Sequence, residues 1–151
     1  MQEGDIAPDF ELQASDGNLV KLSNYRGKNV ILCFYPKNHL FACPSKKVFK
    51  MAQAIVSAYP EISALGAALF SISVDTVEDQ KKFVDEYRIP YLHLSDSKKE
   101  TCKAYAGLNI AGLAKRSTFI INKEGKIAKI FLDIKVEIHG KEIIEALKSL
   151  K

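Results

Sequence analysis

One cysteine of this sequence stands where a thiol becomes reactive. Residues 30–34 are uniformly apolar, Pro36 ends that run, a loop spans 37–42, and Cys43 then precedes Pro44. Proline suits the first helical position, where its missing N–H costs nothing. Cys43 therefore lies at or beside the N-cap of a predicted helix, where the helix dipole and the free N–H groups lower a thiol pKa. The pattern predicts a nucleophile, and the alternative is a small apolar residue that happens to begin a helix.

The elements around Cys43 alternate between strands and helices. Apolar runs predict strands at 30–34, 69–74, 118–121 and 127–132, and helical spacing predicts helices over 48–62, 77–87, 97–104 and 142–151. The turn residues 16–18 join two short runs into an N-terminal hairpin, and 89–92 is interpreted as a connection or short edge segment. This order predicts an α/β three-layer sandwich with a mixed central sheet, and a thioredoxin-like layout fits it.

Composition restricts the class of protein. The 151 residues form one predicted domain, 1–151. Its composition, with 47% hydrophobic and 26% charged residues, is typical of a globular chain. A net charge of +4 with scattered lysines argues against nucleic-acid binding. The central uncharged stretch, 62–74, is shorter than the roughly 20 residues of a membrane span, and the polar start resembles no targeting signal, so we expect a cytoplasmic protein.

The cysteine count excludes two further classes. The chain has 3 cysteines, an odd number, so at least one thiol is free. They are Cys33, Cys43 and Cys102, and none of the spacings is Cys-x-x-Cys. A secreted disulfide scaffold and a zinc knuckle are therefore both disfavoured. Cys33 lies in the middle of a predicted strand and is interpreted as a buried hydrophobic residue.

Segments along nearly the whole chain resemble the peroxiredoxins. They are 4–10, 22–28, 34–37, 94–96 and 116–125. Within that family the sequence is most similar to the Q-type branch, also called bacterioferritin comigratory protein. The resemblance implies reduction of hydrogen peroxide and organic hydroperoxides by a peroxidatic cysteine, with no metal and no cofactor.

The resemblance also implies roles for three residues. The family motif Pro-x-x-x-Thr/Ser-x-x-Cys matches at Pro36 and Cys43, and the family's distant arginine matches Arg116. The thiolate of Cys43 would attack the peroxide to give a sulfenic acid, while Arg116 holds the thiolate and polarises the O–O bond. Pro36 would shield the thiolate from solvent. Without the family, Arg116 would be an ordinary surface arginine that opens a strand.

The motif departs from the family at its hydroxyl position, which is Leu40. Leucine donates no hydrogen bond, and loss of one such donor costs on the order of 10²–10³ in rate. His39 and Ser45 are interpreted as an exposed loop residue and a first-turn residue rather than as replacements. Two hypotheses remain: a working thiol peroxidase with reduced activity, which we favour, and a weakened peroxiredoxin-fold protein that acts as a redox sensor or binding module.

The oxidised cysteine needs a second thiol. The positions where relatives carry a resolving cysteine are Val48 and 83–84 in this chain, and neither holds cysteine. Cys102 is the remaining candidate, with a half-exposed helix residue as the alternative. We therefore expect a one-cysteine mechanism in which an external thiol such as thioredoxin, glutaredoxin or glutathione reduces Cys43. The protein is expected to be a monomer or a homodimer.

Overall fold

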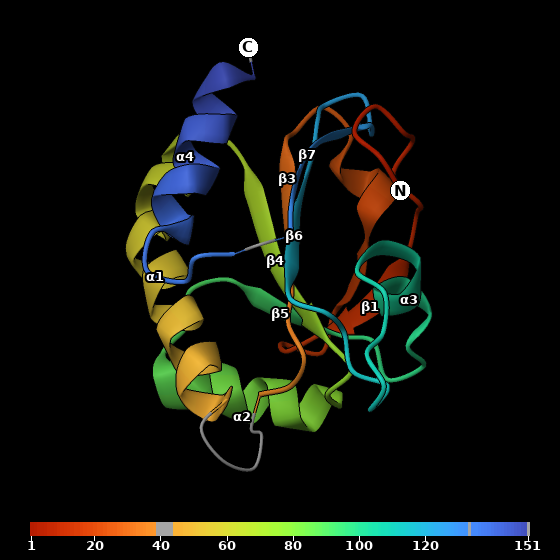
Figure 1. Cartoon of the computed structure of the whole chain (residues 1–151), viewed down its shortest axis with the longest axis vertical. Coiled ribbons are helices and arrows are strands. Elements are labelled where there is room, and N and C mark those ends of the chain that lie inside the picture. Colours follow the sequence, from red (N-terminus) through yellow and green to blue (C-terminus); the bar gives the residue numbers. More distant parts are fainter. Residues whose placement is uncertain (39–43, 133, 151) are drawn as a thin grey trace.

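The computed structural model describes residues 1–38, 44–132 and 134–150, those at 44–48 by their backbone alone (Figure 1). The strands are β1 (Glu11–Ala14), β2 (Leu19–Lys21), β3 (Val30–Phe34), β4 (Ala68–Ser73), β5 (Leu92–Ser95), β6 (Ser117–Ile121) and β7 (Ile127–Phe131). The helices are η1 (Leu22–Tyr25), α1 (Pro44–Ala64), α2 (Val77–Tyr87), α3 (Glu100–Tyr105) and α4 (His139–Ser149).

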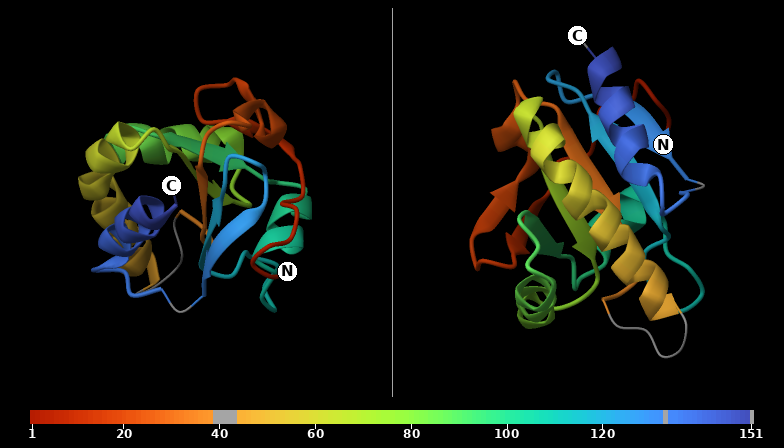
Figure 2. Two further views of the ribbon diagram at one scale, coloured as in Figure 1. Left: turned by 90° about the horizontal axis from the view of Figure 1, so that it is seen from above. Right: turned by 90° about the vertical axis from the view of Figure 1, so that its left-hand side faces the viewer.

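Within these described residues the strands form one mixed sheet in the order β2-β1-β5-β4-β3-β6-β7. Strands β3, β4 and β5 run parallel, and the other neighbours are antiparallel. Helices α1, α2 and α4 cover one face, while α3 and the N-terminal segment lie on the other (Figures 1 and 2). The predicted three-layer α/β sandwich with a mixed sheet is confirmed.

The N-terminal hairpin is also confirmed. Strands β1 and β2 pair with Leu12 opposite Val20, and Gly17 adopts a φ of +88° in the connecting turn. The carboxylate of Asp16 accepts the Asn18 N–H at 3.0 Å and closes that turn. Strand β1 also pairs with β5, so the hairpin extends the central sheet.

One central strand was not predicted. Residues 89–91 form a connection, which is one of the two predicted alternatives, whereas the edge segment is wrong: the strand is β5, Leu92–Ser95, and it lies between β4 and β1. Its sequence hides it, since His93 and Ser95 are buried although strands in the middle of a sheet are usually apolar. Their hydrogen bonds, described below, are what allow polar side chains at these positions.

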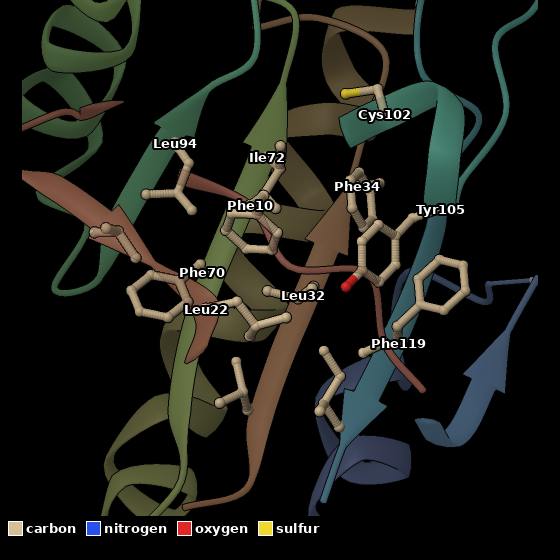
Figure 3. Packing of buried hydrophobic residues seen from close by; sticks show 14 of the residues in the cluster. Phe10, Leu22, Leu32, Phe34, Phe70, Ile72, Leu94, Cys102, Tyr105 and Phe119 are labelled. Carbon is tan, nitrogen blue, oxygen red and sulfur yellow. The ribbon is translucent and has the colours of Figure 1, made fainter. Parts of the chain in front are cut away.

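The central strands bury side chains on both faces. In β3, Leu32 and Phe34 join the core beneath α3, whereas Ile31 and Cys33 join the core beneath α1, α2 and α4. Figure 3 shows the first of these cores, in which Phe34 packs against Tyr105 of α3. Alternation of this kind is expected for a strand that is covered on both sides. Strand β3 is thereby held firmly up to the point where the candidate site begins.

Candidate active site

The sheet brings Pro36 and Arg116 to the same place. Strands β3 and β6 are antiparallel neighbours, and Phe34 lies opposite Ser117. The residues that follow Phe34 and those that precede Ser117 therefore lie at one end of the sheet, at the bottom of Figure 1. Helix α1 begins at this same end. Two segments that are distant in sequence thus approach each other where the carboxyl end of β3 leaves the sheet.

Arg116 has hydrogen-bonding capacity that the described residues do not use. Its side chain is partly buried, and its Nε and Nη1 atoms are inaccessible to solvent without a hydrogen-bond partner among those residues. Burial lowers the pKa of the guanidinium below its usual value. A buried charged donor without an acceptor is costly, and such groups are therefore rare. Arg116 is thus prepared to bind an anion or another acceptor at this end of the sheet.

Cys43 and Leu40 fall among residues 39–43, outside the described part of the chain. Their predicted roles stay predictions. The prediction that Pro44 opens the helix is confirmed, because α1 begins there. Pro36 is partly buried, between the buried Tyr35 and the exposed Lys37. Its shielding role likewise stays a prediction.

Cys33 is the buried hydrophobic residue that its place in the sequence indicates. It is fully buried, and burial raises the pKa of its thiol to about 12. The hydroxyl of Thr118 on β6 hydrogen-bonds the sulfur and opposes this shift without cancelling it. Cys33 is not in a disulfide. A thiol of this kind is inert because it is protonated and inaccessible.

Cys102 is more buried than expected. The alternative of a half-exposed helix residue is wrong, because its exposed fraction is 0%. Figure 3 shows Cys102 close to Phe34, in the core between α3 and the sheet. Burial, and then the neighbouring carboxylate of Asp96, raise the pKa of the Cys102 thiol. Asp96 also accepts the Cys102 N–H at 2.6 Å, which fixes the first turn of α3 against the sheet.

A buried polar cluster beside the site was missed by the sequence analysis. It joins Tyr35, Asn38, Ser73, Asp75, Gln80 and His93, all of them buried. Burial lowers the pKa of His93 to about 3, so this imidazole is neutral near pH 7. The available signal was the recurrence of serine and histidine in otherwise apolar strands at 69–74 and 92–95. That pattern indicates polar groups paired inside the core, although not which groups pair.

The described residues contain no group of three or more His, Cys, Asp or Glu side chains arranged to hold a metal ion. None of the described helices is both long and apolar enough to cross a bilayer.

The fold together with the similarity to known proteins defines a class, that of thiol peroxidases with a thioredoxin-like fold. The AhpC/TSA family model matches residues 4–130, and the chain belongs to that family. Peroxiredoxin Bcp of Bacillus subtilis is 32% identical over 155 residues, covering 97% of this chain and 95% of that protein.

Solved structures agree with this membership. Peroxidoxin BcpB of Mycobacterium tuberculosis superposes with a TM-score of 0.86 at 26% identity, covering 100% of this chain and 99% of the other. A mutant of PrxQ from Xylella fastidiosa gives a TM-score of 0.87 at 23% identity over 99% and 96% of the two chains, and at that identity it supports the fold alone. The chain is a peroxiredoxin that is similar to the proteins named Bcp and peroxiredoxin Q, and peroxiredoxins are oxidoreductases that reduce hydroperoxides with electrons from thiols.

Proposed function

We propose that Cys43 is the peroxidatic nucleophile of this enzyme. The Cys43 thiolate attacks the distal oxygen of a hydroperoxide, so that an S–O bond forms while the O–O bond breaks. The leaving oxygen departs as alkoxide or hydroxide and takes a proton to become an alcohol or water. Cys43 is left as a sulfenic acid. Arg116 stabilises the thiolate and the charge that develops on the leaving oxygen, and Pro36 limits the access of water.

The two buried Arg116 nitrogens, Nε and Nη1, which have no partner in the part of the chain that the structure describes, carry this proposal. They are charged, partly removed from solvent and located at the end of β3 from which the chain leads to Cys43. Donors that are oriented before the reaction stabilise a transition state without the cost of reorganisation. A surface arginine, the alternative considered for this residue, would have its N–H groups in water.

The second half of the cycle needs an external thiol. Cys33 and Cys102 are both buried, and the pKa of each thiol is raised, so neither is a ready nucleophile. A thiol from thioredoxin, glutaredoxin or glutathione would attack the sulfenic sulfur, release water and form a mixed disulfide, which a second thiol then reduces. We further propose that the enzyme acts in the cytoplasm, as a monomer or homodimer.

Leu40 supports a second candidate function. Without the motif hydroxyl the site lacks one donor to the peroxide. A chain that is oxidised once by peroxide but turns over poorly would serve as a redox sensor or binding module.

Sulfenic acid formation at Cys43 separates the possibilities. The chain has no tryptophan, so the oxidation is followed by mass spectrometry after trapping with dimedone rather than by indole fluorescence. We expect one adduct on Cys43 with stoichiometric peroxide near pH 7 and none in Cys43→Ser. An unmodified, accessible Cys43 would rule out the peroxidatic role. Rapid oxidation without turnover in an NADPH assay with thioredoxin or glutaredoxin would favour the sensor.

Two further variants test the details. Peroxide-treated wild type and Cys102→Ser are compared by non-reducing mass spectrometry, and a disulfide between Cys43 and Cys102 would refute the one-cysteine mechanism.

Leu40→Thr restores the hydroxyl of the motif. We expect its peroxide rate to be equal to or higher than that of the wild type, and a fall in rate would show that the altered loop does not depend on this donor.

A further inference from the structure

Asn38 directly precedes residues 39–43 and is bound through its backbone N–H and through both the oxygen and the nitrogen of its side-chain amide. Its N–H donates to Asp75 Oδ2 at 2.9 Å, and its Nδ2 donates to Gln80 Oε1 at 3.0 Å and to the Asp79 carbonyl at 3.4 Å. Its Oδ1 accepts the hydroxyl of Tyr35 at 2.5 Å. Only 2% of the residue is exposed. A residue in a loop is seldom held in this way, because loops normally bind water.

The partners of Asn38 are fixed in turn. Gln80 Nε2 donates to Ser73 Oγ at 2.8 Å and to the Leu94 carbonyl at 3.0 Å. Ser73 Oγ donates to Asp75 Oδ2 at 2.5 Å, the same oxygen that accepts the Asn38 N–H. These hydrogen bonds therefore form a closed ring that joins Asn38, Gln80, Ser73 and Asp75. The ring connects Asn38 to α2 and to the carboxyl end of β4, and Gln80 extends it to β5.

The direction of the hydrogen bonds follows from the proton inventory. Tyr35 has one hydroxyl proton, which it donates to Asn38 in the shorter bond, although Gln80 Oε1 also lies 2.9 Å away. His93 Nδ1 lies 2.8 Å from the same hydroxyl oxygen. The neutral imidazole therefore carries its proton on Nδ1 and donates it to Tyr35, an assignment that rests on the partners rather than on observed hydrogens. His93 thus binds the Tyr35 hydroxyl, and Tyr35 in turn binds the Asn38 side chain.

We propose that Asn38 is a positioning residue for peroxide reduction: bound by Tyr35, Asp75 and Gln80, it fixes the chain that leads from β3 into Cys43. The inference rests on the proposed role of Cys43. Apart from His93 Nε2, the buried side-chain polar atoms of this network have partners among the described residues. Such a network favours one arrangement because any other leaves desolvated polar groups unpaired. The network lies on the α2 side of the site, opposite Arg116, so it fixes the entry to the reactive segment relative to the arginine on β6.

Displacement of a nucleophile by about 1 Å costs on the order of 100-fold in rate. Loss of the anchor should therefore slow the reaction with peroxide more than it affects the fold. It should also raise the pKa of Cys43, because a thiolate that leaves the helix N-terminus and Arg116 loses their stabilisation. If Asn38 only stabilised the fold, the variant molecules that remain folded would show neither the slower peroxide reaction nor the raised pKa of Cys43.

Two tyrosines provide a matched test. Tyr35→Phe removes the hydroxyl that binds Asn38, whereas Tyr105→Phe removes a hydroxyl that donates to the Pro8 carbonyl at 2.5 Å, in the core beneath α3. Both variants lose one phenolic hydroxyl, although Tyr35→Phe also removes the contact of that hydroxyl with His93 Nδ1. Asn38→Ala removes the anchor itself. For each folded variant we would measure the peroxide rate constant of Cys43, the pH dependence of its alkylation by iodoacetamide, and the melting temperature.

We expect Asn38→Ala to lower the peroxide rate about 10- to 100-fold and Tyr35→Phe about 3- to 10-fold. The peroxide rate of Tyr105→Phe should stay within about twofold of the wild type even though this variant also loses a buried hydrogen bond. The alkylation midpoint should rise by about half a pH unit or more in Asn38→Ala. The proposal is overturned if Asn38→Ala and Tyr35→Phe match Tyr105→Phe in rate and keep the wild-type alkylation midpoint.

The alkylation profile separates this inference from the proposed function. If the wild type forms no sulfenic acid at Cys43, the peroxidatic role fails, whereas alkylation still reports how Cys43 is held. A raised midpoint in Asn38→Ala would then support positioning of the thiol without catalysis. An unchanged midpoint would reject positioning as well.

Discussion

Two buried polar regions flank the end of β3, and they differ in how completely they are paired. On the α2 side, Asn38 and its partners use nearly all their donors and acceptors, and His93 Nε2 is the exception among the described residues. On the β6 side, Arg116 keeps two buried donors without a partner in the same part of the chain. Buried groups that are hydrogen-bonded to one another favour a single conformation, whereas a buried charged group with unused donors can bind a ligand. The comparison sets the proposed positioning network against the proposed catalytic arginine.

The strongest way to break the paired region is Gln80→Leu. This change removes the acceptor of Asn38 Nδ2 and the donor to Ser73 Oγ and the Leu94 carbonyl. Each orphaned buried group costs about 1–3 kcal/mol, so we expect the free energy of unfolding to fall by roughly 3–5 kcal/mol. Urea denaturation measures the loss.

Lys81→Met is the matched control on the same helix. It breaks an exposed ion pair with Asp85 at 3.3 Å, and such pairs contribute less than about 1 kcal/mol. If Gln80→Leu were no more destabilising than Lys81→Met, the network would not be the tightly coupled structure that its distances indicate.

The unpaired region should respond in the opposite way. Arg116→Met removes the proposed stabilisation of the transition state, so we expect the peroxide rate to fall on the order of 10²–10³-fold. The free energy of unfolding should be unchanged or higher, because a partly buried guanidinium with unpaired N–H groups is itself costly. Dimedone trapping and thermal unfolding measure the two quantities.

Arg116→Lys keeps the charge but loses the planar fork, and its rate should lie between those of the wild type and Arg116→Met. A large loss of stability in Arg116→Met would show instead that the guanidinium has a structural partner. The contrast between the two regions would then disappear.

Acid should lower the free energy of unfolding through the paired region, by less than Gln80→Leu does. The pKa of His93 is lowered by burial to about 3, against about 6.5 in the unfolded chain. Between these values the unfolded chain binds a proton that the folded protein does not, so stability is full above about pH 6.5 and falls as the pH decreases toward 3. At pH 5 the expected loss from this group is about 2 kcal/mol.

His93→Phe removes this titration and should flatten the decline in stability between pH 6.5 and 5. His139, whose pKa is also lowered by burial, contributes a change of the same sign in both proteins. Equal slopes for wild type and variant in urea denaturation across this pH range would exclude His93 as the source.

The two regions also differ in how far the sequence predicted them. The roles of Arg116 and Pro36 are predicted from short motifs that resemble a family, because such motifs consist of residue types at a fixed spacing. The network was missed because Asn38, Gln80 and His93 lie on three separate segments whose hydrogen bonds exist only after packing. The strand β5 was misplaced for the same reason, since its buried polar residues resemble those of a connection.

Local chemistry determined much of this protein before any packing. Apolar runs specified the central strands, turn residues specified the hairpin, and Pro44 marked the start of α1. Only the tertiary structure decided that Cys102 is fully buried, that two Arg116 donors have no partner among the described residues, and that Asn38 is bound through its N–H and its side-chain amide. The physical reason is that burial and hydrogen-bond pairing are properties of neighbours in space, and strand pairing sets these neighbours across long separations in the chain.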